Sequence, residues 1–131
     1  MSATIYILNG PNLNLLGVRE PHLYGSTTLA QVEQLCRRVA SELALHCEFR
    51  QTNHEGVMVD WVQEAREKAA AVVINPAGLS FRSIPLLDAL KTLDQPIAEV
   101  HITNIHRRDP LYQNSLVSLA ATGVICGFGP F

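Results

Sequence analysis

The chain has 131 residues, of which 47% are hydrophobic and 17% charged, a composition ordinary for one globular domain with its own core. We therefore expect a single domain over residues 1–131. The formal net charge of -2 argues against nucleic acid as a partner, and no apolar run approaches the roughly 18 residues of a membrane span. Because no charged leader precedes the first apolar run, we expect a cytoplasmic protein.

Strand-like apolar runs alternate with helical patterns along the whole chain. The runs cover residues 3–8, 47–52, 70–75, 96–103 and 122–128. Apolar residues recur at three- and four-residue steps over residues 29–43, and Thr28 with Gln31 has the pattern of a capping box. A second helical pattern covers residues 58–65, and a shorter one begins near Ser83. Strands and helices that alternate in this way predict a doubly wound α/β domain with a mostly parallel sheet.

Polar residues gather in the segments that follow the first, third and fourth of these strands. The segments read NGPNLNLLG from Asn9, NPAGLSF from Asn75 and HITNIHRRD from His101. In open parallel sheets, ligands bind beyond the carboxyl ends of the strands, near the point where the strand order reverses. The sequence therefore predicts that these three segments converge on one site.

The segment from Asn9 to Gly25 is long for a connection, since most loops have about 4 to 6 residues. Its leucines argue against disorder, so a lid is the first hypothesis. The segment lacks both the GK[ST] ending and the GxGxxG spacing of phosphate-binding loops. Asn12 and Asn14 have two open interpretations, turn formation or a role in the site.

Tyr24 and Arg19 lie close together in this segment. A lone tyrosine is more often a packing residue, and a phenol with its ordinary pKa near 10 is a poor base at neutral pH. A guanidinium that approaches the ring stabilises the phenolate, which makes base chemistry plausible.

His101 and Glu99 are two residues apart on the fourth strand, so both side chains point to the same side of the sheet. Such a histidine is often structural, but a carboxylate beside it could orient the imidazole and support its protonated form. Asn75 ends a wholly apolar strand, where a polar side chain needs a partner or a ligand.

Cysteines and histidines give no sign of a metal centre. Cys36, Cys47 and Cys126 show no paired spacing, and we interpret them as reduced structural residues. The five histidines include no pair four residues apart, so we expect no bound metal.

Taken together, five motifs resemble the type II 3-dehydroquinate dehydratases over nearly the whole chain. The motifs are NGPNLNLLGxREPxxYG, HEGxxxDW, NPAG, EVHITNIHRR and GVICGFG. The resemblance implies a flavodoxin-like fold and the anti elimination of water from 3-dehydroquinate to 3-dehydroshikimate through an enolate, in the shikimate or quinate pathway. It implies no cofactor, metal or Schiff base. It also implies a dodecamer, a tetramer of trimers, in which Asp88 reaches a neighbouring subunit's site.

The resemblance assigns the proton abstraction to one group of residues. Tyr24 would be the phenolate that takes the proton from C2, with Arg19 and Arg108 stabilising its charge. Asn12 would hold a water molecule that stabilises the enolate oxygen.

The departure of the hydroxyl falls, by the same resemblance, to a second group. His101, oriented by Glu99 and close to Asn75, would protonate the leaving hydroxyl. The backbone at Ile102 and the side chain of Thr103 would hold the substrate carboxylate.

The chain departs from the family pattern at three places. Phe81 stands where the family usually has a histidine that contacts substrate hydroxyls, and Tyr112 stands where it usually has an arginine. The chain ends at Phe131, where the family typically continues into a helix that covers the sheet. The first two departures predict weaker or altered recognition of the substrate's ring hydroxyls.

Two rival interpretations follow from these departures. One is a divergent paralogue that acts on, or only binds, a related cyclic hydroxy acid. The other is a non-catalytic flavodoxin-like module. The pairing of Tyr24 with Arg19, and of His101 with Glu99, argues against the module, because a scaffold has no need of a paired base and acid.

Overall fold

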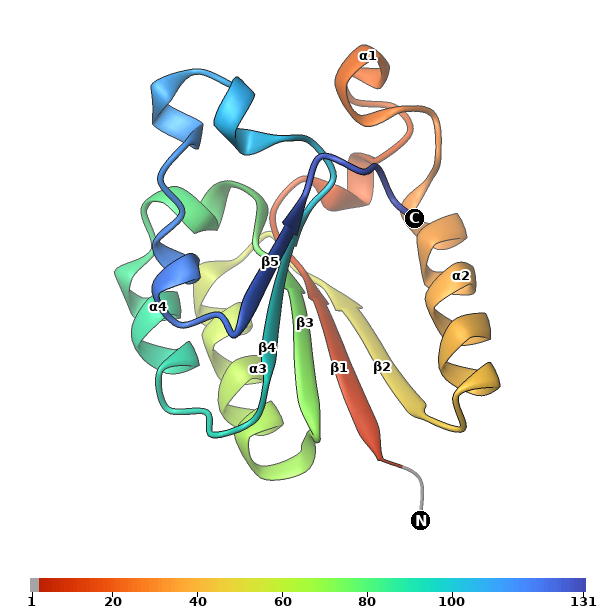
Figure 1. The fold of residues 1–131 in the computed structure, drawn as a ribbon, viewed down its shortest axis with the longest axis vertical. Helices are drawn as coiled ribbons and strands as arrows, with labels where there is room; N and C mark the ends of the chain where they lie inside the picture. Colours follow the sequence, from red (N-terminus) through yellow and green to blue (C-terminus); the bar gives the residue numbers. More distant parts are fainter. Residues whose placement is uncertain (1–2) are drawn as a thin grey trace.

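The five expected strands form one parallel sheet in the computed structural model, which describes residues 3–131 (Figure 1). The strands are β1 (Thr4–Asn9), β2 (His46–Gln51), β3 (Ala71–Asn75), β4 (Ile97–His101) and β5 (Gly123–Cys126). Their order is β2-β1-β3-β4-β5, and every neighbouring pair is parallel. The order reverses between β1 and β3, which confirms the predicted flavodoxin-like, doubly wound arrangement.

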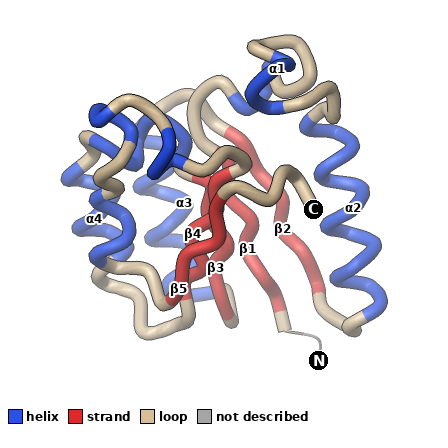
Figure 2. The backbone as a smooth tube through the Cα atoms, turned by 45° about the horizontal axis from the view of Figure 1, so that its top comes forward, coloured by secondary structure: helices blue, strands red, loops and turns tan. Residues whose placement is uncertain are grey.

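Helices lie on both faces of this sheet, as Figures 1 and 2 show. Helix α2 (Leu29–Glu42) packs along β2 on one face, while α3 (Glu55–Lys68) and α4 (Ile84–Leu90) cover the other. The predicted capping box is present, since the Thr28 side chain accepts from the Gln31 backbone and the Gln31 side chain accepts from the Thr28 backbone. Ser83 caps α4 by accepting from the backbone of Leu86.

The hydrophobic core lies between the sheet and the helices α3 and α4. Its fully buried members include Leu8, Met58, Val62, Ile74 and Leu90. Burial of each such side chain contributes about 1.5 to 3 kcal/mol, so this face supplies much of the stability of the fold. The α2 face is covered less completely, because Ile125 on the edge strand β5 is 58% exposed.

Short helical turns follow the carboxyl ends of the strands. After β1 come η1 (Leu13–Leu15) and the single-turn helix α1 (Pro21–Tyr24), and η2 (Ala77–Phe81) follows β3. After β4 come η3 (Ile105–Arg107), η4 (Pro110–Tyr112) and η5 (Leu116–Leu119). The segment from Asn9 to Gly25 therefore has secondary structure of its own, which its sequence did not predict. In the described part of the chain, no helix has the length and apolar character that crossing a membrane requires.

Candidate active site

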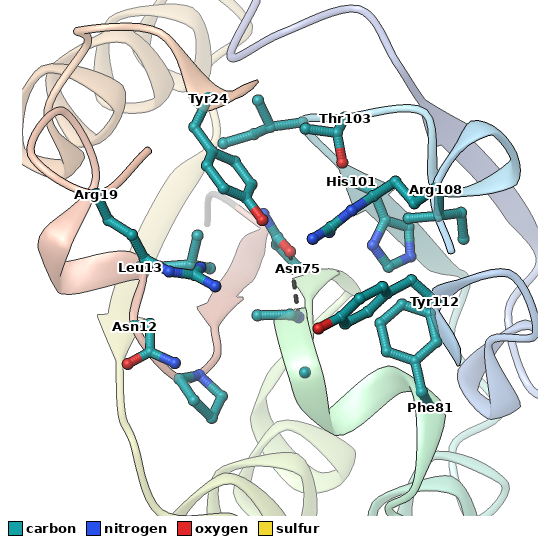
Figure 3. Close-up of a pocket in the computed structure, with 15 residues that line it drawn as sticks. Asn12, Leu13, Arg19, Tyr24, Asn75, Phe81, His101, Thr103, Arg108 and Tyr112 are labelled. Atoms are coloured by element: carbon teal, nitrogen blue, oxygen red, sulfur yellow. Dashed lines mark hydrogen bonds between the residues drawn. The ribbon is translucent and has the colours of Figure 1, made fainter. Parts of the chain in front are cut away.

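A cavity of about 210 Å³ opens at the carboxyl ends of the strands, and the three polar segments line it (Figure 3). The predicted site residues among its lining are Asn12, Arg19, Tyr24, Asn75, Phe81, His101, Ile102, Thr103, Arg108 and Tyr112. Five residues of the same three segments, which the sequence did not single out, complete the wall, namely Pro11, Leu13, Ala77, Gly78 and Ile105. The predicted convergence of the three segments is therefore confirmed.

Tyr24 projects into the cavity from the last position of α1 (Figure 3). This turn begins with Pro21, whose fixed φ suits the first helical position, and ends at Gly25, whose φ of 79 few other residues adopt readily. The guanidinium carbons of Arg19 and Arg108 lie 5.3 Å and 5.8 Å from the centroid of the Tyr24 ring. Two positive charges from different segments thus flank one phenol.

Asn12 adopts a left-handed backbone conformation with φ of 69, at the start of η1. Its backbone N–H donates to Oδ1 of Asn53 at 2.9 Å, and the side chain of Gln51 donates to the same oxygen at 3.1 Å. These contacts fix the turn and leave the Asn12 side chain on the wall of the cavity. Asn12 therefore both forms the turn and lines the cavity, so its two interpretations are compatible. Asn14 is exposed and does not line the cavity.

His101 ends β4 opposite the tyrosine and is 7% exposed. Its Nε2 lies 2.5 Å from Oε2 of the fully buried Glu99, as expected for residues on the same side of a strand. The Ser118 hydroxyl donates to the other carboxylate oxygen of Glu99, also at 2.5 Å. Ser118 lies 17 positions beyond His101 in a short turn, and nothing in its local sequence identified it.

The environment of Glu99 keeps its carboxylate ionised. Burial by itself raises the pKa of Glu99, but contacts with His101, Ser115 and Ser118 outweigh the burial and hold this pKa below its usual range. The carboxylate contacts Nε2 and so orients the His101 ring, which lines the cavity. The pair is therefore placed for proton transfer with a bound substrate.

The two departures from the family pattern lie together in space, beside His101 (Figure 3). The rings of Phe81 and Tyr112 meet edge to face, with centroids 5.4 Å apart and an interplanar angle of 82°. Phe81 stacks on the ring of His101 at 6.3 Å, and the guanidinium carbon of Arg108 lies 4.2 Å from the Tyr112 centroid. We call Phe81 and Tyr112 the aromatic wall.

The remaining predicted residues are placed less uniformly. Asn75 accepts a hydrogen bond from the backbone of Ala77 at 3.3 Å and still lines the cavity. Asp88 is exposed on α4 and does not line the cavity. Glu99 does not line the cavity either, but it contacts His101, which does. No group of three histidine, cysteine or carboxylate side chains within residues 3–131 is placed to hold a metal ion.

Comparison with known proteins gives consistent matches over the full length. The family model described as dehydroquinase class II matches residues 3–131. The chain is 53% identical over 131 residues to 3-dehydroquinate dehydratase 1 of Agrobacterium fabrum, covering 100% of this chain and 90% of that protein. It is 54% identical over 129 residues to the 3-dehydroquinate dehydratase of Phenylobacterium zucineum, covering 98% and 89%.

Solved structures of similar proteins have the same fold. The type II dehydroquinase of Propionibacterium acnes superposes with a TM-score of 0.95 at 44% identity, covering 99% of this chain and 90% of that one. The type II dehydroquinase of Butyrivibrio crossotus gives a TM-score of 0.96 at 32% identity, covering 98% and 90%.

Proposed function

The chain belongs to the class II dehydroquinase family and is a 3-dehydroquinate dehydratase, and we propose how the residues of its pocket divide the reaction between them. The enzyme is a lyase of the shikimate pathway. One observation carries the proposal: a tyrosine flanked by two guanidinium groups and a carboxylate-paired histidine line the same cavity. A base and an acid are thus both within reach of one small substrate.

Tyr24 acts as the base in this proposal. Its phenolate takes the proton from C2 of 3-dehydroquinate, and the electrons of the broken C–H bond form the enolate. The charges of Arg19 and Arg108 near the ring favour the phenolate over the phenol. Asn12, whose side chain lines the cavity on the same side, holds a water molecule against the developing enolate oxygen.

His101 acts as the acid. When the enolate collapses to the conjugated enone, the C1–O bond breaks and His101 protonates the departing hydroxyl, which leaves as water. Glu99 supports the protonated imidazole before this transfer and orients its ring. Asn75 and Thr103, together with the backbone of Ile102, line the adjoining wall and bind the substrate's polar groups.

The aromatic wall bears on which cyclic hydroxy acid the enzyme prefers. A phenyl ring has no donor and a phenol has one, whereas histidine and arginine offer more. We therefore propose weaker contacts to ring hydroxyls than in relatives that carry histidine and arginine there. The alternative that this wall favours is a preference for a cyclic hydroxy acid related to 3-dehydroquinate.

Asp88 supports a proposal about assembly. Its side chain is exposed on α4 and takes no part in the pocket of its own chain, which suits a residue that completes a neighbouring subunit's site in a homo-oligomer such as a dodecamer. A cytoplasmic location is also proposed, and three cysteines without disulfides agree with it.

The decisive experiment follows the ultraviolet absorbance of the conjugated enone product after addition of 3-dehydroquinate to the parent and to Tyr24→Phe. The variant loses only a hydroxyl, so it should fold normally and bind substrate. Its rate should fall about 10²- to 10⁴-fold, the usual contribution of a general base. A variant that keeps more than about a tenth of the parent rate would exclude Tyr24 as the base. Leu23→Ala, an exposed neighbour outside the lining, is the control and should retain the parent rate.

A further inference from the structure

Arg108 lies between two tyrosine rings on the wall of the cavity (Figure 3). Its guanidinium carbon is 4.2 Å from the centroid of Tyr112 and 5.8 Å from that of Tyr24. A guanidinium within about 6 Å of an aromatic centroid is attracted to the ring, and the attraction grows at closer approach. Tyr112 is thus the closer of the two aromatic partners of Arg108.

Other contacts do not explain the direction of this side chain. Within residues 3–131, Arg108 forms no ion pair with a carboxylate. The side chain of Gln113 donates to the Arg108 carbonyl at 2.6 Å, which fixes the backbone but not the guanidinium. An arginine without a partner samples many rotamers, so the Tyr112 ring is the contact that selects one of them.

Phe81 keeps the Tyr112 ring in place. The edge-to-face contact between the two rings is of the favourable kind, and Phe81 rests in turn on His101. A continuous series of contacts therefore runs from the acid His101 through the aromatic wall to Arg108 and the base. A second arginine at position 112 would instead place a like charge against Arg108.

We propose that Tyr112 is a positioning residue, whose ring holds the Arg108 guanidinium beside Tyr24 so that its charge stabilises the phenolate. The proposal rests on the proposed function, because Arg108 acts on the reaction through Tyr24. It assigns the effect to the ring of Tyr112 and not to its hydroxyl. The aromatic wall then acts on the base through Arg108, in addition to its effect on substrate recognition.

The test compares Tyr112→Phe, which keeps the ring, with Tyr112→Leu, which removes it. The parent and both variants are assayed with 3-dehydroquinate for kcat and KM between about pH 6 and pH 10, where phenols with stabilised charge ionise. Tyr112→Phe keeps the ring, so the ascending limb of its pH profile should stay where it is in the parent, and the loss of the hydroxyl should appear in KM. Tyr112→Leu should lower kcat by about 3- to 30-fold, with a smaller change in KM, and should move the ascending limb of the profile to higher pH.

Controls separate positioning from a general loss of structure. Leu111→Ala alters the exposed neighbour of Tyr112 in the same turn, outside the lining, and should match the parent. Circular dichroism and thermal unfolding establish that each variant is folded. If Tyr112→Leu does not fold, Phe81→Leu replaces it, because a loosened Tyr112 ring should shift the profile in the same direction.

Three outcomes would overturn the proposal. A folded Tyr112→Leu, or its Phe81→Leu replacement, with the parent kcat and pH profile would show that the ring does not position Arg108. A Tyr112→Phe whose kcat falls and whose ascending limb moves as far as in Tyr112→Leu would show that the hydroxyl, and not the ring, is responsible. If the parent did not turn over 3-dehydroquinate, the proposed function would fail and this proposal would fail with it. The assay of the parent alone distinguishes that failure from a failure of the positioning role.

Discussion

At the level of single residues, the charge on Glu99 determines how His101 can act. Glu99 is fully buried, and a buried carboxylate stays ionised only where hydrogen bonds compensate for lost water. Those bonds come from His101 on one oxygen and Ser118 on the other. Ser118 therefore belongs to the acid arrangement together with His101 and Glu99.

Replacement of Ser118 should expose this dependence. Ser118→Ala removes a hydrogen bond to a charged group, a contribution of about 1.5 to 3 kcal/mol, so kcat should fall by roughly 10-fold or more. The pKa of Glu99 should also rise, so activity should be lost at a higher pH on acidification than in the parent. Steady-state kinetics against pH measures both effects. Ser118→Thr keeps the hydroxyl and should lie closer to the parent, and an Ala variant with parent kinetics would contradict the role.

The residues found from the sequence and those missed differ in one physical respect. Tyr24, Glu99 and His101 could be predicted because the chemistry of a phenol near a guanidinium, or of a strand pair two residues apart, is local. Ser118 and Asn53 act through contacts between segments 19 and 41 positions apart in sequence, respectively. No periodicity marks such contacts, so only the folded structure reveals them.

At the level of elements, three parts of the fold are joined by one polar network on the α3 side of the sheet. Glu64 on α3 accepts hydrogen bonds from Tyr6 on β1 and from Arg50 on β2, both at 2.6 Å. The bonds from Arg50 and Tyr6 lower the pKa of Glu64 from 4.5 to about 2. Burial, followed by the contact with Glu64, raises the pKa of Tyr6 from 10.0 to about 12.

These shifts predict how stability depends on pH. A lowered carboxyl pKa means that the unfolded chain binds the proton more readily, so the stabilisation is present above about pH 4.5 and is lost as pH falls toward about 2. Glu64→Gln should be destabilised at pH 7 by on the order of 1 kcal/mol, since the pair is partly exposed. Urea unfolding should show this difference shrinking on acidification. Glu67→Gln, at an exposed pair on the same helix, should change little, and a pH-independent difference for Glu64→Gln would refute the linkage.

A close backbone contact holds together the segments that follow β1 and β3, next to Asn12 and Asn75. The Gly10 N–H donates to the Asn75 carbonyl at 2.8 Å, and a Cβ at Gly10 would lie 2.4 Å from the carbonyl oxygen of Pro76. Both neighbours are backbone, so they cannot move aside as a flexible side chain can. Only glycine therefore fits at this position.

Gly10→Ala should for this reason impair stability and catalysis together. Overpacking of this kind costs about 1 to 3 kcal/mol, and the displaced loops would shift both asparagines in the site. Unfolding in urea and kcat/KM for 3-dehydroquinate measure the two effects. Gly56→Ala on α3 is the matched control, because no atom lies within 4 Å of its added carbon. Unchanged stability in Gly10→Ala would mean that the loops can separate without loss.

Strands and helices were predictable because each carries its own periodicity. The regular hydrophobic spacing of α2 and the capping box at Thr28 gave its position almost to the residue. The strand expected over residues 96–103 ends earlier, at His101, because the chain turns there into the site. The short turns η1 to η5 were missed, since three to five residues contain too few positions for a period to emerge.

At the level of the whole molecule, the chain presents features that a single copy does not use. Asp88 is exposed away from its own pocket, and apolar residues on and after β5 are also exposed, with Ile125 at 58% and Phe128 at 81%. Monomers carry scattered exposed apolar residues, but an apolar edge strand, which pairs with the sheet on one side only, is a place where other chains can associate. These observations support assembly into a homo-oligomer.

Subunit mixing tests whether Asp88 serves a neighbouring site. Asp88→Asn leaves Tyr24 intact, whereas Tyr24→Phe leaves Asp88 intact, so neither homo-oligomer should have a complete site. If each site combines a pocket from one subunit with Asp88 from its neighbour, random reassembly of equal amounts should restore about a quarter of the parent sites.

The two variants are mixed in mild denaturant, refolded, sized by light scattering and assayed with 3-dehydroquinate. Unmixed samples treated identically are the control. A mixture no more active than the average of its components, in oligomers of confirmed mixed composition, would show that every site is built within one chain.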